Sequence, residues 1–310
     1  MNAETYAEWL RRQGYEVIRT PSSYWHSNGL RVFQAFPYHW LIEPSEAELS
    51  DLFSRHRAIA VRYALPPDCK AGCSSYAIVF DGSSYAVEQL GHRTRKNVRR
   101  GLRNCLVEPI SFERLVDEAW HLRRDTLSRQ GRQLKVTNES WRNRYLAAAD
   151  LPGFQAWGAY VNNRIGAYLV TFWMEDCISV VDQQSHREYL DLNVNNAITF
   201  VMSEHALAQP GVRSVFYGVE SLDAPPSVSE FKFRMGYVAK PIRQRVVFRP
   251  QLAVFANQLS YRVVSLVSKW LPADRRFAKA KGMLRLCLAE RVSSFSAALE
   301  CHESRLNDNE

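Results

Sequence analysis

A dense run of basic side chains between positions 93 and 103 is the feature of this sequence best suited to binding a charged partner. Side chains three and four residues apart lie on one face of a helix, so a helix here would carry two adjacent basic rows, with Val98 and Leu102 facing inward. The basic residues are Arg93, Arg95, Lys96, Arg99, Arg100 and Arg103. Like charges without interleaved acids repel one another, which favours a phosphate-bearing partner such as a nucleotide, a tRNA or a lipid-linked pyrophosphate. A solvated helix face is the alternative.

The composition indicates an ordinary globular protein and excludes disordered, collagenous and membrane-embedded chains. The 310 residues are 46% hydrophobic and 23% charged, and 40 Lys and Arg exceed 32 Asp and Glu to give a formal net charge of +8. At roughly 100–200 residues per domain, the chain is long enough for two modest domains or one large one. Its basic balance suits an acidic or phosphate-bearing partner.

The cysteines and the N-terminus indicate a reducing compartment. Six cysteines are scattered along the chain, mostly in apolar runs, which is typical of buried thiols in a cytosolic protein. Cys69 and Cys73 lie close together but lack the further ligands of a zinc site, so we expect no metal. The first ten residues contain acids and a Trp where a signal peptide would be basic and then apolar. Because no apolar stretch reaches ~20 residues, we expect a cytoplasmic protein without a transmembrane segment.

The elements that must position the polar side chains are mixed strands and helices. In the first half, helices are expected over 5–13, from Ser45, over 112–129 and over 139–149, and strands over 58–63 and 75–80. From 154 onward the predicted order is strand, strand, strand, helix, strand, helix, strand. These elements are expected at 154–161, 165–173, 177–182, 192–208, 214–219, 228–235 and 246–248. Asn162 and Asn163 tolerate positive φ and predict a tight hairpin between the first two strands.

Beyond Pro250 the sequence predicts helices to the end of the chain. One apolar face would hold Phe255, Leu259, Val263, Leu266, Val267 and Trp270, opposite Asn257, Arg262, Ser265 and Lys269. A basic helical stretch follows over 275–291. We expect this pair of helices to cover the core; a helix on a membrane surface, and with it peripheral membrane contact, is the alternative.

Three segments resemble the GNAT acyltransferase superfamily, and more narrowly its Fem-type branch and related acetyltransferase-like proteins of polysaccharide and envelope systems. They are the basic segment 91–102, the strand and helix of 180–206, which contain Asn195-Asn196-Ala197, and Phe231-Lys232-Phe233-Arg234-Met235-Gly236-Tyr237. The resemblance implies an α/β (α+β) fold: a mixed twisted sheet flanked by helices, in two tandem GNAT-like halves. The implied domains are an N-terminal half with the basic helix at 1–150, a catalytic core at 151–250 and a helical extension at 251–310.

The resemblance also implies where substrates bind. In a GNAT domain two neighbouring strands part and hold a thioester carbonyl while an amine attacks it, and the loop after the first of them binds a pyrophosphate. Here that loop spans 183–193 and lacks the glycines of the common motif. Its implied donors to acyl-CoA are Gln183, Ser185, Arg187, Asn193, Asn195 and Asn196. Acyl-CoA would be a co-substrate and not a tightly bound cofactor. Fem-type relatives also lack the glycine loop and use aminoacyl-tRNA, so the donor stays open.

The implied catalytic residues are those that could move a proton. Lys232 stands four residues before Gly236, where many GNAT enzymes place a Tyr that protonates the leaving group. A lysine could donate a proton or stabilise an oxyanion; a surface lysine between two buried Phe is the alternative. His186, Glu220 and Asp182 are candidate bases for the attacking amine. Tyr217 could replace either His186 or Glu220 as a hydrogen-bonding group.

Three functions follow as hypotheses. The first is an N-acyltransferase that acylates, and most simply acetylates, an amine on a sugar, a peptide or a cell-envelope precursor. The second is a tRNA-dependent aminoacyl transferase, although no heptad run for a coiled-coil tRNA arm is present. The third is a non-catalytic GNAT-like protein that binds nucleic acid through its basic helix. The absence of Gly-x-x-x-x-Gly-Lys-Ser/Thr, His-Glu-x-x-His and Gly-x-Ser-x-Gly argues against P-loop enzymes, zinc proteases and α/β-hydrolases.

Overall fold

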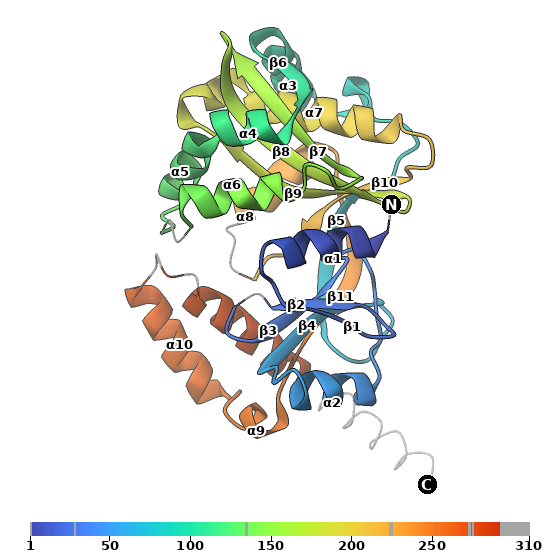
Figure 1. The fold of residues 1–310 in the computed structure, drawn as a ribbon, viewed down its shortest axis with the longest axis vertical. Helices are drawn as coiled ribbons and strands as arrows, with labels where there is room; N and C mark the ends of the chain where they lie inside the picture. The colour runs from blue at the N-terminus through green and yellow to red at the C-terminus, as the bar shows by residue number, and fades with distance from the viewer. Residues whose placement is uncertain are drawn as a thin grey trace, which may run out of the picture. The chain divides into compact units, whose positions relative to one another are not determined.

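The structure is a computed structural model, and it describes residues 2–27, 29–133, 136–222, 226–271, 274 and 276–291 (Figure 1). The part of the predicted helical extension beyond Arg291 lies outside these residues. The described chain forms two compact units that interleave along the sequence. The first unit comprises Met1–Glu16, Ala77–Glu220 and Ala224–Lys240, and the second comprises Val17–Tyr76, Ser221–Asp223 and Pro241–Glu310. The domain boundaries at 150 and 250 stay a prediction.

The first unit is a mixed sheet flanked by helices, as the resemblance predicted. Its strand order is β5-β10-β9-β8-β7-β6. The strands are β5 (Cys73–Phe80), β6 (Leu106–Ile110), β7 (Phe154–Val161), β8 (Arg164–Met174), β9 (Cys177–Ser185) and β10 (Ser214–Val219). The helices are α1 (Ala3–Arg12), η1 (Val87–Gln89), α3 (His92–Asn104), α4 (Phe112–Glu118), α5 (Trp120–Arg129), α6 (Asn138–Leu146), η2 (Arg187–Leu192), α7 (Val194–Leu207) and α8 (Pro226–Arg234).

The predicted meander is confirmed. Strands β7, β8 and β9 pair antiparallel in succession and lie side by side (Figure 1). Asn162 and Asn163, with φ of 49° and 61°, form the turn between β7 and β8. Positive φ at both central residues gives the turn a twist that matches the flanking strands. The helix predicted over 112–129 is instead two helices, because α4 ends and α5 begins around Ala119.

The basic helix α3 buries Val98 as predicted, but its inward face is rotated away from Leu102. Its buried residues are Thr94, Val98 and Gly101, whereas Leu102 is exposed. A Cβ atom on Gly101 would lie 2.6 Å from the main-chain oxygen of Asn193 and 3.0 Å from the Cβ of Ala197. Glycine is therefore required for α3 to approach the start of α7 this closely, and that contact sets the inward face.

In the second unit the strand order is β1-β2-β3-β4-β11, with β3 and β4 parallel and the neighbouring pairs antiparallel. The strands are β1 (Val17–Arg19), β2 (Tyr24–Ser27), β3 (Val32–Phe36), β4 (Ala60–Leu65) and β11 (Val238–Phe248), and the helices are α2 (Glu46–Ser54), α9 (Pro250–Ala253) and α10 (Gln258–Trp270). Helix α2 begins at the predicted capping box, in which Ser45 and Glu48 each bond to the other's main chain. Trp25, Phe33 and Leu52 are fully buried in the core.

The C-terminal helices differ from the prediction in which face is covered. Tyr261 and Val264 of α10 pack against Leu284 and Cys287 of the helix at 276–291. The face that we expected to cover the core is exposed: Phe255, Leu259, Val263, Leu266 and Trp270 are all large exposed apolar residues. Within the described part of the chain, no helix has the length and apolarity to cross a membrane.

Candidate functional site

Strands β9 and β10 part within the sheet of the first unit. They run parallel and pair only where Ser214–Phe216 lies beside Cys177–Ser179. Just beyond this point each strand contains an extra residue: the register skips Val181 between β9 and β8, and Tyr217 between β10 and β5. A bulge bends its strand and increases the local twist. The two bulges therefore lie where the strands separate, which is the feature that the GNAT resemblance implied.

Lys232 reaches this parting of the strands from helix α8. Its Nζ atom donates to the main-chain oxygen of Tyr217 at 3.0 Å and lies 4.7 Å from the centre of the Tyr217 ring. Burial lowers the pKa of Lys232 to about 8. Near neutral pH the side chain therefore exists in both charged and neutral forms, which suits a group that must give and take a proton.

Side-chain hydrogen bonds continue from Tyr217 toward the loop after β9. The Tyr217 hydroxyl donates to Gln183, whose Nε2 atom lies 3.3 Å from both Asn195 Oδ1 and Thr199 Oγ1 on α7. Asn195 in turn donates to Ser185 Oγ at 3.0 Å. Burial raises the pKa of Tyr217, so its hydroxyl stays protonated. The structure thus joins Lys232 and Tyr217 to three of the residues predicted to bind the donor.

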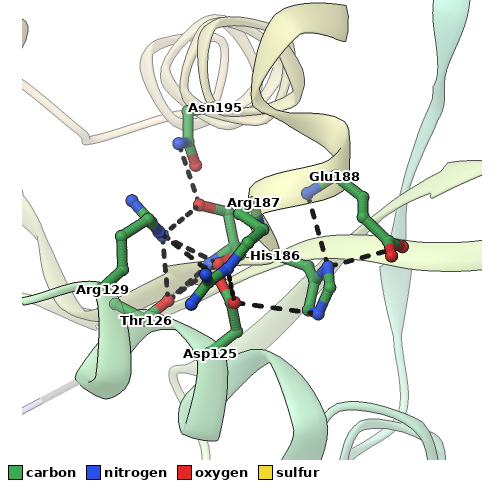
Figure 2. A network of polar contacts seen from close by, with 8 residues as sticks. Asp125, Thr126, Arg129, His186, Arg187, Glu188 and Asn195 are labelled. Atoms are coloured by element: carbon green, nitrogen blue, oxygen red, sulfur yellow. Dashed lines mark hydrogen bonds and ion pairs between the residues drawn. The ribbon is translucent and has the colours of Figure 1, made fainter.

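This polar chain ends in a cluster around Asp125 of α5 (Figure 2). The Asp125 carboxylate accepts from the main-chain nitrogen of Arg187 at 2.9 Å and from its Nε at 2.5 Å. Arg129, one turn later on α5, lies 3.4 Å from the same carboxylate and donates to the main-chain oxygen of Ser185 at 3.0 Å. Burial alone would raise the pKa of Asp125, but hydrogen bonds from Arg187 lower it below its usual range. An ionised carboxylate therefore lies against the loop.

The main-chain N–H groups of residues 185–189 in this loop are already used within the protein. The N–H of Ser185 bonds to α5, that of His186 to β8 and that of Arg187 to Asp125. The N–H of Glu188 bonds to the ring nitrogen Nδ1 of His186, and the N–H of Tyr189 bonds to the main-chain oxygen of His186. A pyrophosphate needs N–H donors that point at it and is repelled by a carboxylate. Residues 185–189 in this arrangement do not fit the pyrophosphate of coenzyme A.

His186 belongs to the Asp125 cluster. Its Nε2 atom lies 3.9 Å from Asp125, and its Nδ1 atom lies 3.6 Å from the carboxylate of Glu188 (Figure 2). The ring of His121 lies 5.7 Å away, between ring centres. Burial lowers the pKa of His121, and the charge of His186 lowers it further. A catalytic role for His186 stays a prediction.

The two acidic candidates have different surroundings. Asp182 is held from several sides: Tyr145 and Gln184 each donate to it at 2.6 Å, and Arg123 lies 3.8 Å away. Burial alone would raise the pKa of Asp182, but the charge of Arg123 and these bonds lower it. Its oxygens are thus occupied in holding α5, α6 and β9 together. Glu220 directly follows β10 and is half-buried.

The other predicted binding residues lie on α7 and α3. Asn193 adopts a left-handed conformation, with φ of 62°, and precedes α7. Asn196 Nδ2 lies 3.3 Å from the sulfur of Met235. Along α3, Arg95 is half-buried, while Lys96, Arg99 and Arg100 are exposed. Arg99 lies 3.4 Å from Glu88, a surface pair of the kind that contributes little to stability.

Sequence reasoning missed the contribution of helix α5. Asp125, Thr126 and Arg129 all contact the loop after β9. The only signal was an Asp followed four residues later by an Arg, which is also the pattern of an ordinary exposed ion pair. Among the described residues, no three His, Cys, Asp or Glu side chains are grouped so that they could hold a metal ion.

Comparison with known proteins finds similarity in structure alone. No family model and no curated protein matches the sequence. The C-terminal domain of a putative lysylphosphatidylglycerol synthetase from Agrobacterium fabrum superimposes with a TM-score of 0.55 at 11% identity, over 86% of this chain and 92% of that one. FemX superimposes with a TM-score of 0.55 at 10% identity, over 81% and 92% of the two chains.

A third solved structure, L-PGS from Bacillus licheniformis, has a TM-score of 0.54 at 10% identity and covers 80% of this chain and 92% of its own. At these identities the likeness concerns the fold. The chain has the fold that FemX and these lysylphosphatidylglycerol synthetase domains share, in agreement with the Fem-type resemblance of the three sequence segments.

Proposed function

We propose that the protein is an N-acyltransferase, which transfers an acyl group from an activated donor to an amine of a sugar, a peptide or a cell-envelope precursor. The observation that carries the proposal is the position of Lys232 beside the parting of β9 and β10, with its pKa lowered to about 8. The likeness in fold to FemX and to lysylphosphatidylglycerol synthetase domains supports it.

The chemistry needs one new bond, one broken bond and two proton movements. The amine nitrogen attacks the acyl carbonyl carbon to form the C–N bond, and the bond from that carbon to the leaving group breaks. The attacking amine loses a proton and the leaving group gains one. Neutral Lys232 is the base for the first movement, and its ammonium form is the acid for the second. N–H groups of β9 beyond Ser179, where pairing with β10 has ended, are suited to stabilising the oxyanion.

The most common acyl donor for this chemistry is an acyl-CoA, and acetyl-CoA is the first donor to test. Because the loop at 185–189 does not fit a pyrophosphate in this arrangement, we assign the donor's phosphates to helix α3. Lys96, Arg99 and Arg100 are exposed there on a helix whose sequence contains no acid. Such a row attracts phosphates by charge and does not require a glycine loop.

The poor fit of residues 185–189 to a pyrophosphate and the exposed basic row on α3 also favour a second candidate, an aminoacyl-tRNA donor. An aminoacyl ester needs no pyrophosphate cradle next to its carbonyl, and an extended basic row suits the phosphates of a nucleic acid. In this case the attack breaks a C–O bond to the ribose of tRNA instead of a C–S bond. Lys232 would handle the protons in the same way.

Isothermal titration calorimetry with acetyl-CoA and with bulk aminoacylated tRNA distinguishes the donors. Arg99→Gln with Arg100→Gln should weaken binding of the true donor and reduce its dependence on salt. Arg213→Gln, which removes an exposed arginine outside α3, is the matched control and should bind as the wild type does.

Incubation with the bound donor and a panel of amino sugars and lysyl peptides, followed by mass spectrometry, tests transfer. Binding of nucleic acid without transfer to any amine would instead favour a non-catalytic nucleic-acid-binding protein. Failure of both donors to bind would overturn the proposal.

A further inference from the structure

Helix α10 has two apolar faces, and within the part of the chain that the structure describes only one of them is covered. Tyr261 and Val264 face the helix at 276–291 and pack with its Leu284 and Cys287. At 3.6 residues per turn, residues 259, 263, 266 and 270 fall on the opposite side of α10. The covered face is enough to anchor the helix on the second unit, so the outer face needs another explanation.

The outer face is a continuous apolar stripe. Leu259 is 71% exposed, Leu266 58% and Trp270 85%, and Val263 between them is 51% exposed. Phe255, three residues before the helix, is also 65% exposed. Single exposed apolar side chains are normal, but four large ones in one row on a helix mark an interaction surface.

The charge around this stripe is of one sign. Arg262 and Lys269 are exposed and lie seven residues apart, so both flank the same edge of the stripe. The sequence from Pro250 to Leu271 contains no Asp or Glu. A partner that covers this face must therefore be apolar at its centre and negatively charged at its edge.

A second copy of the same helix does not meet this requirement. In a two-fold symmetric contact each face meets itself, and the segment 250–271 contains no acid that could pair with Arg262 and Lys269 of the other copy. An anionic membrane does meet it, because its acyl layer takes the Leu, Val and Trp side chains while its headgroups neutralise the cations. At thirteen residues α10 is too short to span a bilayer, so it would lie in the plane of the surface.

We propose that the outer face of α10, formed by Leu259, Val263, Leu266 and Trp270, binds the surface of a membrane that contains anionic lipids. In the sequence, this membrane-surface helix is the alternative to a helix that covers the core. The proposal is independent of the acyl donor and of catalysis, because it rests on the second unit and makes no use of Lys232.

Flotation of the full chain with vesicles tests it. The wild type should float with vesicles of equal parts phosphatidylcholine and phosphatidylglycerol, bind phosphatidylcholine vesicles weakly, and lose binding as salt is raised. Leu266→Ser with Trp270→Ser should reduce the partition coefficient more than about tenfold, because both side chains leave the acyl layer. Leu106→Ser, which removes an exposed leucine from β6, is the matched control and should leave it unchanged.

Removal of positive charge tests whether Arg262 and Lys269 bind the anionic headgroups. Arg262→Gln and Lys269→Gln should each reduce binding to the anionic vesicles about fivefold and leave the weak binding to phosphatidylcholine unchanged. Since all four substituted side chains are exposed, the variants should melt like the wild type, which is checked by circular dichroism.

Three results would overturn the proposal. They are no flotation of the wild type with anionic vesicles, equal flotation of the Leu266→Ser, Trp270→Ser variant, and a dimer in light scattering that this variant dissociates. The last result would assign the face to a second copy of the chain.

Discussion

The ammonium group of Lys232 donates to the main-chain oxygen of Tyr217 at 3.0 Å, at the very residue that the register between β10 and β5 skips. A bulged residue does not take part in the ladder of its own strand, so its carbonyl is open to another donor. One inserted residue in β10 thus both helps to part the strands and provides the acceptor that holds Lys232 at the parting.

The rate of acyl transfer should rise with pH through the pKa of Lys232, about 8, and level off above it. The sign follows from the role of base: only neutral Lys232 accepts the proton that the substrate amine gives up as it forms the C–N bond, and the neutral fraction of Lys232 grows as pH increases. Lys232→Met should lower kcat/KM by roughly 100-fold or more and remove this limb of the profile. Arg234→Met, an exposed cation on the same helix, is the control. If Lys232→Met kept the pH profile of the wild type, Lys232 would not be the base.

Lys232 should also make stability depend on pH. Its pKa falls from an ordinary value near 10.5 to about 8 in the folded protein, so between these values the unfolded chain binds more protons than the folded one. Stability should therefore increase with pH across this window. Relative to Lys232→Met, urea unfolding should show a gain on the order of 1 kcal/mol between pH 7.5 and 9.5, reduced by the partial exposure of the side chain. A difference that stays constant with pH would contradict the burial of the ammonium group.

Replacement of Asp125 should both destabilise the first unit and expose an anion site. Asp125→Ala removes the acceptor of the Arg187 main-chain N–H and of its guanidinium, at a cost of about 1–3 kcal/mol. Because those donors then point at an unoccupied position, inorganic pyrophosphate should raise the melting temperature of the variant and not that of the wild type. Asp117→Ala, which removes an exposed carboxylate paired with Arg142, is the control. Equal stabilisation of wild type and variant would show that Asp125 does not close the loop to phosphate.

The contact between α3 and α7 should tolerate no side chain at position 101. Gly101→Ala places a Cβ atom 2.6 Å from the main-chain oxygen of Asn193, and the backbone there cannot move without shifting the start of α7. We expect a loss of about 1–3 kcal/mol in urea unfolding, although alanine favours helices elsewhere. Gly91→Ala, at a glycine with no atom within 4 Å of its Cβ position, should be close to neutral. Similar effects of the two substitutions would contradict this account of the α3 face.

Much of the fold was predictable because its signals are local. Asn162-Asn163 predicts its hairpin from the φ angles of two residues, and Ser45 predicts the start of α2 through a capping box with Glu48. The bulges at Val181 and Tyr217 were not predictable, since one extra residue in a strand leaves the composition unchanged. The gap between β9 and β10 was therefore implied by resemblance and not by periodicity.

The candidate site also contains residues that the sequence predicted and residues that it did not. Lys232, Gln183 and Ser185 lie in segments that resemble a known family, and the structure joins them through Tyr217 and Asn195. The contact of Asp125 with the loop was not predicted because its partner Arg187 is distant in sequence, and only the packing of the folded chain brings the two together. Helix α10 shows a different limit: both its faces are apolar, and periodicity does not tell which of two apolar faces is covered.

The interleaving of the two units along the chain has a consequence at the level of the gene. The path passes from one unit to the other five times, at positions 16, 76, 220, 223 and 240. No single stop codon or internal start site can yield either unit whole. A fragment that ends at residue 240 would lose the half of β11 that pairs with β4, leaving β4 without that neighbour. Truncations should therefore leave at least one unit incomplete, and recombination between relatives should exchange both units together.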